Sequence, residues 1–495
     1  PDIGADEITL AGPGTVQFST TSYTNSEGNT ATITVNRTGG VSGAISVDYA
    51  AGGGTATGGA ACTAGVDYIT PTPGTLSWAN ADAAAKTFNV QLCTDTDTPE
   101  TESLDLTLSN PIGTSITGTN PVPLNITDVP PPLNGDYQVP GDYATLTAAV
   151  ADYNVRGVSG PVRFLLNNAT YDTGAGETFP IVIATTGPDT TATNTLTIQP
   201  NAGITSAIVG SSASGIVVIG DQFVTINGDN VGGDVARNLT VNNTATTANS
   251  YVVGLFNFGG TKVARNATVR YSNIRGGVTV AGTVSWGIIL NGSGGDYDNV
   301  LIENNKIWQA YVGIGHYGVA ATGINNNNII RNNIIGDTTG SNESIKLRGI
   351  EVTQSSGLTI DGNDVFGLPA GNSNSTQAGI LLSTGGANNT VTRNNIHDFY
   401  YIGTGGLSTH GILISENGGT TNITNNFIHN IKADGDVFNT ATNILWMPAG
   451  ITISGTTTGT LNIDHNSIYM SGATLGSTFT GNSACFSSVA GVTGV

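Results

Sequence analysis

Three stretches of the chain repeat one pattern: LTIDGNDVF at residues 358–366, NTVTRNNIH at 389–397 and TNITNNFIH at 421–429. Each holds two aliphatic residues separated by four others, with an Asn two positions before the second aliphatic residue. The aliphatic pairs recur as Val269/Ile274, Ile302/Ile307, Ile329/Ile334, Ile360/Val365, Val391/Ile396, Ile423/Ile428 and Ile463/Ile468, and the asparagines as Asn305, Asn332, Asn363, Asn394, Asn426 and Asn466. A unit this short cannot bury its apolar face alone, so the pattern predicts stacked units that share one core.

A second recurring strand begins with Gly-Ile and precedes each Asn strand. It occurs as Gly287-Ile288, Gly313-Ile314, Gly349-Ile350, Gly379-Ile380, Gly411-Ile412 and Gly450-Ile451. The whole unit repeats every 26 to 40 residues or so, which is typical of a solenoid. Stacking would align the asparagines in a column, where each amide can bond the backbone at a bend and the next Asn.

This combination resembles the right-handed parallel β-helix of pectate-lyase-like proteins. The resemblance covers residues 136–495 and implies an all-β fold with an N-terminal capping helix. Residues 142–154 fit that helix, because Leu146, Ala149, Val150 and Tyr153 recur at helical spacing. A β-propeller is the main alternative, but it would need hairpin signals that the repeats lack.

The first part of the chain has a different texture. Short alternating strands are expected at residues 31–35, 45–49, 75–78, 87–92 and 104–108, separated by Gly-rich turns, which is typical of a β-sandwich. A proline run at Pro130, Pro131 and Pro132 is poorly suited to a sheet interior. We therefore expect an N-terminal segment (1–13), a sandwich (14–128), a linker (129–135) and the solenoid (136–495).

The sandwich resembles a Calx-β domain. The resemblance rests on Glu27-Gly28 and on ISVDYA (45–50), GVDY (65–68), GTLSW (74–78), LTLSNP (106–111) and NITD (125–128). It implies a calcium site in loops at one end, with the acidic ligands at Glu27, Asp67, Asp95, Glu102 and Asp128. Thr94 and Pro99 depart from the family's acidic pattern, and Asp97 and Glu100 are additional candidate ligands. Calcium prefers such hard oxygen ligands, and closely spaced like charges are costly unless neutralised.

Composition excludes several classes of protein. Asp and Glu outnumber Lys and Arg by 35 to 15, giving a net charge of −20, whereas nucleic-acid binding needs clustered basic residues. No apolar run reaches the roughly 18 residues of a membrane span. Few lysines and the pair Cys62 and Cys93 favour export. These two cysteines are expected to form a disulfide, with two buried free thiols as the alternative.

Candidate functional residues of the solenoid lie near its variable inserts. Flat aromatic side chains beside polar groups suit a polysaccharide, and the candidates are Trp308, Tyr311, Tyr400, Tyr401 and Trp446. The alternative for this region is an aromatic stack of side chains that follow the second aliphatic residue, formed by Trp308, Phe366, His397, His429 and Tyr469. The favoured alternative is the stack.

Catalytic candidates are weaker. Elimination on uronates needs a base such as Lys346 or Arg348, and His397 with Asp398 and His410 is the most catalytic-looking cluster. Hydrolysis needs two carboxylates, and no pair is fixed among Asp337, Glu343, Glu351, Asp398, Asp434 and Asp436.

The end of the chain bears on assembly. Cys485 lies 34 residues after Ile451, so Ala484-Cys485 is expected to be the next Gly-Ile strand, with its Asn strand beyond Val495. We expect the natural chain to continue, or the open end to pair with another molecule.

The sequence as a whole predicts an exported or cell-surface structural and adhesive protein with a calcium-stiffened sandwich. Its expected partners are an extracellular polysaccharide or another surface protein, with neither nucleic acid nor a membrane span. Two alternatives remain: a polysaccharide lyase or hydrolase with a groove on the solenoid, and a subunit of an extracellular filament.

Overall fold

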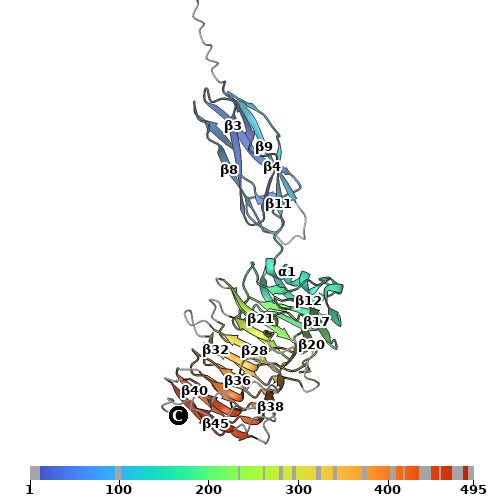
Figure 1. Ribbon diagram of the computed structural model, residues 1–495. Helices are drawn as coiled ribbons and strands as arrows, with labels where there is room; N and C mark the ends of the chain where they lie inside the picture. Colours follow the sequence, from blue (N-terminus) through green and yellow to red (C-terminus); the bar gives the residue numbers. More distant parts are fainter. Residues whose placement is uncertain are drawn as a thin grey trace, which may run out of the picture. The chain divides into compact units, whose positions relative to one another are not determined.

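The computed structural model describes residues 12–488, except 95–101, 232, 234, 260–261, 278–282, 292–296, 319–324, 338–342, 371–375, 402–407, 416–417, 434–446, 456–458 and 471–482. It divides into two compact units, Pro1–Pro131 and Pro132–Val495 (Figure 1). Within the described residues, no helix combines the length and the apolar character that crossing a bilayer requires.

The first unit is a sandwich of two sheets. One has the order β10 (Ser115–Ile116), β1 (Thr15–Phe18), β3 (Thr30–Thr38), β8 (Lys86–Leu92), β6 (Tyr68–Ile69) and β5 (Gly58–Gly59). The other has the order β2 (Tyr23–Ser26), β11 (Val122–Thr127), β9 (Glu102–Ile112), β4 (Ile45–Gly54) and β7 (Gly74–Trp78). Alternate residues of β3, β8 and β9 are buried, so each strand contributes one apolar face to a shared core.

The second unit stacks its strands into three long sheets of parallel neighbours, and the sequence colours run from green to red along the stack in Figure 1. Sheet I contains β12 (Leu133–Val139), β13 (Val158–Leu166), β16 (Leu196–Pro200), β19 (Val224–Asn227), β23 (Thr268–Arg270), β26 (Leu301–Glu303), β30 (Ile329–Arg331), β34 (Thr359–Asp361), β37 (Thr390–Thr392), β40 (Thr420–Thr424) and β43 (Thr460–Asp464). Sheet II contains β14 (Thr170–Tyr171), β17 (Ser206–Gly210), β20 (Leu239–Asn243), β24 (Ser272–Arg275), β27 (Lys306–Trp308), β31 (Ile334–Ile335), β35 (Asp364–Ala370), β38 (Asn395–Tyr401), β41 (Phe427–Lys432) and β44 (Ser467–Tyr469). Sheet III contains β15 (Ile181–Ile183), β18 (Val217–Ile219), β21 (Ser250–Gly259), β25 (Ser285–Asn291), β28 (Val312–Tyr317), β32 (Arg348–Thr353), β36 (Gln377–Leu382), β39 (Thr409–Ile414), β42 (Ala449–Ile453) and β45 (Ala484–Ser488).

Two short pairings complete the described strands. β22 (Lys262–Val263) folds back antiparallel onto β21, and β29 (Asn325–Asn326) pairs with β33 (Ser355–Ser356). The predicted all-β fold, a sandwich followed by a parallel β-helix, is therefore confirmed.

Helix α1 (Leu146–Arg156) covers the first coils and begins four residues later than predicted. Thr145 caps the N-terminus of the helix, because its Oγ1 accepts a hydrogen bond from Ala148 N at 3.0 Å. The buried carboxylate of Glu177 accepts from Leu146 N and Thr147 N, at 2.8 and 2.7 Å, and so satisfies the first free amides of the helix. The four residues predicted to face the core are buried.

A column of buried asparagines closes the bend between sheets I and II. Asn305, Asn363, Asn394, Asn426 and Asn466 take the predicted places, but the prediction for Asn332 is wrong, because Asn333 occupies the column. Asn332 instead holds the left-handed turn before it, at φ 55°. The aliphatic pair of this coil is likewise Ile330/Ile335, since Ile302 pairs with Ile330 and Ile307 with Ile335.

The Gly-Ile strands form the matching column of sheet III. Ile288, Ile314, Ile350, Ile380, Ile412 and Ile451 follow one another in register. The last strand is shifted by one residue from its prediction, because Phe486, not Cys485, pairs with Ile451. Nothing larger than glycine fits at Gly313, where a Cβ would lie 2.5 Å from Ile335 Cγ2 and 2.6 Å from Gly349 O.

Candidate functional site

The acidic residues of the sandwich leave neighbouring strands at one end. β2 and β11 are parallel, with Ser26 opposite Thr127, so the next residues, Glu27 and Asp128, emerge side by side. Glu27 N donates to Thr127 O at 3.1 Å. Glu102 begins β9 opposite Ile126, near the end of β11. The sandwich topology therefore gathers three predicted ligands that are far apart in the sequence.

Asp67 reaches the same end from the other sheet. It precedes Tyr68, which pairs with Leu92 at the end of β8, and its carbonyl accepts from Cys93 N at 2.8 Å. Leu92 N in turn donates to Asn29 O at 2.9 Å, which ties the end of β8 to the turn after Glu27.

Burial makes these carboxylates unusual. Glu27 is 5% exposed and Asp67 is 2% exposed. Asp67 Oδ2 accepts from Thr57 N at 2.5 Å, and Glu27 Oε2 from Val129 N at 3.4 Å. Buried carboxylates are costly without a compensating cation or strong hydrogen bonds, and their oxygens are the ligands that calcium prefers. A cation would thus offset the burial of Glu27 and Asp67.

The described residues contain no group of three or more acidic, His or Cys side chains close enough to hold a metal ion. Asp95, Asp97 and Glu100, which belong to the predicted ligand set, lie outside the described residues.

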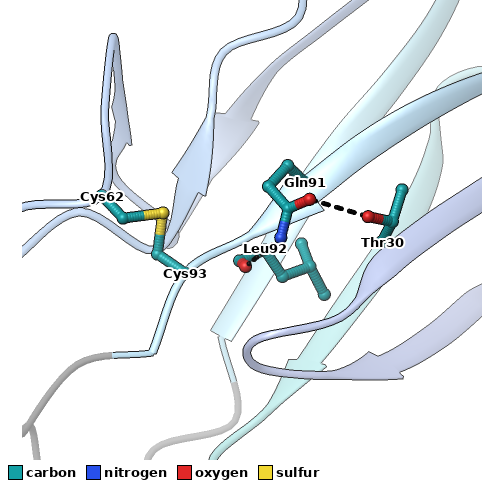
Figure 2. The surroundings of a disulfide bond; sticks show 5 residues. All are labelled: Thr30, Cys62, Gln91, Leu92 and Cys93. Carbon is teal, nitrogen blue, oxygen red and sulfur yellow. Dashed lines mark hydrogen bonds between the residues drawn. A yellow bond between two sulfur atoms is a disulfide. The ribbon is translucent and has the colours of Figure 1, made fainter.

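A disulfide joins Cys62 to Cys93, with Cα atoms 5.3 Å apart. Figure 2 shows it beside the end of β8, where Gln91 accepts a hydrogen bond from Thr30 at 2.7 Å. The bridge fastens the loop before β6 to the residue that follows β8. It therefore holds these two parts of the sandwich together.

The basic catalytic candidates of the β-helix are buried. Lys346 is 3% exposed, and its Nζ lies 3.1 Å from Ser344 Oγ. Burial lowers the pKa of Lys346, and the nearby Glu343 opposes that shift. Arg348 donates to Thr376 O, and burial likewise lowers its pKa.

His397 lies between two carboxylates on the outer side of sheet II. Its Nδ1 is 2.7 Å from Asp398 Oδ2, and its Nε2 is 3.1 Å from Asp364 Oδ1. Burial would lower the pKa of His397, but the hydrogen bonds to these two carboxylates outweigh it and raise the pKa. His410 does not join this cluster, because it is buried against Ser408 and Thr452, at 2.6 and 2.8 Å.

The predicted aromatic stack is confirmed in its centre. The ring of His397 lies 5.0 Å from Phe366 and 4.8 Å from His429, nearly parallel to both. Tyr469 follows His429 in register. The prediction is wrong for Trp308, because Gly336 occupies the intervening coil, next to Phe366.

Trp308 belongs to a separate polar cluster. Its Nε1 donates to Glu343 Oε2 at 3.0 Å, and Lys306 Nζ lies 4.9 Å from its ring centre. Arg275 also bonds Glu343, and Lys306 pairs with Asp337 at 2.6 Å. Tyr311 is 7% exposed, so its face is largely covered. Tyr400 is half-buried, whereas Trp446, Asp434 and Asp436 lie outside the described residues, as does the side chain of Tyr401.

Sequence reasoning missed one aromatic group on sheet III. Trp286 Nε1 donates to Tyr317 OH at 2.9 Å, and Tyr317 OH donates to Glu351 Oε2 at 3.2 Å. Burial, followed by the charge of Glu351, raises the pKa of Tyr317. Their positions in consecutive coils are visible only once the insert lengths between coils are known.

Comparisons with known proteins agree with the two units. Residues 11–128 match the family model of the Calx-beta domain, and residues 261–468 match that of the right handed beta helix region. Among solved structures, the apo-form Calx CBD1 domain is 24% identical, with a TM-score of 0.20, covering 23% of this chain and 98% of that one. The Calx CBD2 domain is 14% identical, with a TM-score of 0.21, covering 24% and 90%. No curated protein matches the chain.

Proposed function

We propose that this chain, which joins a Calx-beta domain to a right-handed parallel β-helix, is an exported structural and adhesive module that binds extracellular glycans. The observation that carries the proposal is the unbroken asparagine column from Asn305 to Asn466. In each step one Asn donates from both its backbone N and its Nδ2 to the Oδ1 of the next Asn, at 2.9–3.0 Å.

Such a column favours a rigid rod. The described strands pair continuously along sheets I, II and III, and one apolar interior runs from Leu133 to Leu461. A coil cannot move independently without breaking buried hydrogen bonds, which are expensive to leave unmade. Rigidity of this kind suits a module that presents a surface at a fixed position.

Calcium is proposed to stiffen the sandwich. Glu27, Asp67, Glu102 and Asp128, completed by acids of the segment 95–101, would hold the ion. When bound, the ion neutralises the clustered carboxylates. Export is supported by the disulfide, since such bridges persist in oxidising compartments.

Calorimetry of the full chain tests the calcium proposal. Chelation should lower the melting temperature of the sandwich transition by about 10 °C, relative to calcium at about 100 times its Kd, and leave the β-helix transition unchanged. Glu27→Gln should abolish the calcium effect, whereas Asp82→Asn, in the loop before the start of β8 at the opposite end of that strand, should preserve it. An equal calcium response in both variants would contradict the site.

A glycan panel tests the adhesive role. The purified chain should retain at least one acidic or neutral extracellular polysaccharide on a sensor surface without shortening it. Release of reducing ends, or of unsaturated products that absorb in the ultraviolet, would instead favour a polysaccharide-degrading enzyme. Retention of none would contradict glycan binding.

A further inference from the structure

We propose that the bend from sheet II to sheet III binds a small inorganic oxyanion, such as phosphate or sulfate, between Arg348 and Gln377. Arg348 begins β32, and Gln377 begins β36, one coil further along. Arg348 pairs in register with Ala378, so Gln377 lies next to its partner. This site lies within the β-helix and is independent of the proposed glycan binding.

Arg348 is a buried cation that lacks an ion pair with the described residues. It is only 9% exposed. The charge of Glu351 opposes the larger effect of burial on the pKa of Arg348, but no ion pair joins the two in the described part of the chain. Glu351 Oε2 instead accepts a hydrogen bond from Tyr317 OH at 3.2 Å. A buried charge is costly unless an opposite charge lies in contact with it, so an anion beside Arg348 would stabilise the fold.

Two buried donors at this place have no acceptor among the described residues. Arg348 donates from Nη1 to Leu347 O at 3.5 Å and to Thr376 O, whereas its Nε has no partner. Gln377 is fully buried, and its Oε1 accepts from Thr409 Oγ1 at 3.4 Å, whereas its Nε2 has no partner. Because Thr376 immediately precedes Gln377, the contact with Thr376 O brings the guanidinium of Arg348 beside Gln377. A water molecule could satisfy either donor, but it would leave the charge of Arg348 uncompensated.

The remaining edge of the guanidinium is suited to an oxyanion. With Nη1 of Arg348 occupied, Nε and Nη2 form a planar fork that matches two oxygens of one anion. A third oxygen can then accept from Gln377 Nε2. Since Gln377 is fully buried and Arg348 nearly so, the site suits a small free ion and not a sulfate group carried by a polymer.

The local charge favours an anion, although the whole chain has a net charge of −20. Residues 336–353 form the bend and β32 of this coil, and with their ion-pair partners they contain four cations and three carboxylates. These are Arg275, Lys306, Lys346 and Arg348, and Asp337, Glu343 and Glu351. One positive charge is therefore in excess. The neighbouring inserts 338–342, 371–375 and 402–407 contain no Asp or Glu, so they supply no further carboxylate.

Calorimetry of the full chain tests the site with inorganic phosphate and with inorganic sulfate, each compared with chloride at equal ionic strength and without calcium. At about 100 times its Kd, the oxyanion should raise the melting temperature of the β-helix transition by about 3–4 °C. The sandwich transition of the same chain should not shift. That comparison separates binding from the general stabilisation that phosphate and sulfate salts give to folded proteins. The two affinities, measured by isothermal titration, identify the preferred ion.

Two variants remove the proposed donors. Arg348→Gln should weaken oxyanion binding by about 100-fold, because two charge-assisted hydrogen bonds are lost. Gln377→Met should weaken it by about tenfold. Because Gln377→Met keeps every charge and a side chain of similar length, it tests the site even where Arg348→Gln does not fold.

Arg237→Gln is the matched control. Arg237 is a half-buried arginine of the β-helix, and burial lowers its pKa as it does that of Arg348, but its Nε already donates to Asn304 O at 2.7 Å. This variant should bind the oxyanion as the wild type does.

Four results would overturn the proposed site: no binding of either ion by the wild type, an equal effect of chloride, an equal shift of the sandwich transition, or unchanged binding in the Arg348 and Gln377 variants. Retention of dextran sulfate without any binding of inorganic sulfate or phosphate would also overturn it. That last result would leave the proposed glycan binding standing, because it would mean that a polymer is recognised elsewhere on the surface.

Discussion

Asn363 Nδ2 donates to Asn394 Oδ1, one coil further along the β-helix, at 2.9 Å, and the backbone N of Asn363 donates to the same oxygen. Asn363 Nδ2 also donates to Ile330 O, in the preceding coil. The side-chain amide of each such Asn therefore connects three consecutive coils through hydrogen bonds. Replacing one Asn leaves the backbone N and Nδ2 of the preceding Asn without their acceptor, and one backbone carbonyl of the preceding coil without its donor. These groups are buried, so leaving them unbonded is costly.

The column predicts that substitutions at two adjacent asparagines differ greatly in their effect on stability. Asn333→Ala removes the acceptor of Asn305 N and Asn305 Nδ2 and the donor to Ile302 O. At about 1–3 kcal/mol for each stranded group, it should destabilise the β-helix by about 3 kcal/mol or more. Asn332→Gly should change stability little, because Asn332 holds a left-handed turn that Gly adopts readily. Urea unfolding measures both, and a greater loss for Asn332→Gly would contradict the observed register.

Gly313 and Ile335 predict a coupled pair of substitutions. Gly313→Ala places a methyl group against Ile335 Cγ2 and should cost about 1–3 kcal/mol through overpacking. Ile335→Ala should cost about 2–5 kcal/mol through the cavity it leaves. The double variant should lose less than the sum of the two, because the new methyl group enters the vacated space. Strict additivity in a double-mutant cycle would contradict this contact, and the remaining clash with Gly349 O limits the rescue.

The fold could be predicted from the sequence because the repeats depend on short local patterns. The register of one coil could not, since NNIIRNNII at residues 327–335 offers two equivalent pairs, Ile329/Ile334 and Ile330/Ile335. Pairing with Ile302 and Ile360 in the neighbouring coils selects Ile330. A choice made by neighbours more than 25 residues away is invisible to a local pattern.

Some residues of the candidate sites could likewise be named from the sequence, and others could not. Glu27 and Asp128 could be named from the Calx-β resemblance, and the parallel pairing of β2 with β11 brings them together. The ion pairs Arg331–Glu303 and Arg393–Asp361 could not be named, because the partners are 28 and 32 positions apart in the sequence and lie on neighbouring coils of the fold. Insert lengths vary from coil to coil, so contacts across coils have no constant spacing.

The disulfide predicts how the sandwich responds to reduction. Cys62→Ala combined with Cys93→Ala opens a loop with a sequence separation of 31 residues. The loss of this restraint on the unfolded chain should cost about 3–4 kcal/mol in the sandwich transition and leave the β-helix transition in place. Calorimetry of the full chain resolves the two transitions. Equal shifts in both would contradict a bridge that acts on the sandwich alone.

His316 predicts an acid-sensitive component of β-helix stability. Its side chain is fully buried in the inward column of sheet III, between Leu290 and Val352, with Nε2 2.8 Å from Asn328 Nδ2. Burial lowers its pKa from 6.5 to about 4. Between pH 6.5 and about pH 4, the unfolded chain therefore binds a proton at His316 that the folded chain does not bind. The free energy of unfolding thus decreases as the pH falls through this range.

The expected loss from His316 is on the order of 3 kcal/mol between pH 7 and pH 4. His316→Leu matches the neighbouring Leu290 and Leu382 of the same column and removes the titrating group. It strands Asn328 Nδ2 at every pH, so the variant should be less stable than the wild type at pH 7. That deficit should shrink or reverse at pH 4. Only the wild type must then keep a buried histidine neutral at a pH at which the unfolded chain protonates it. Parallel stability curves for the two proteins, measured by urea unfolding across this range, would show that His316 does not titrate as its burial requires.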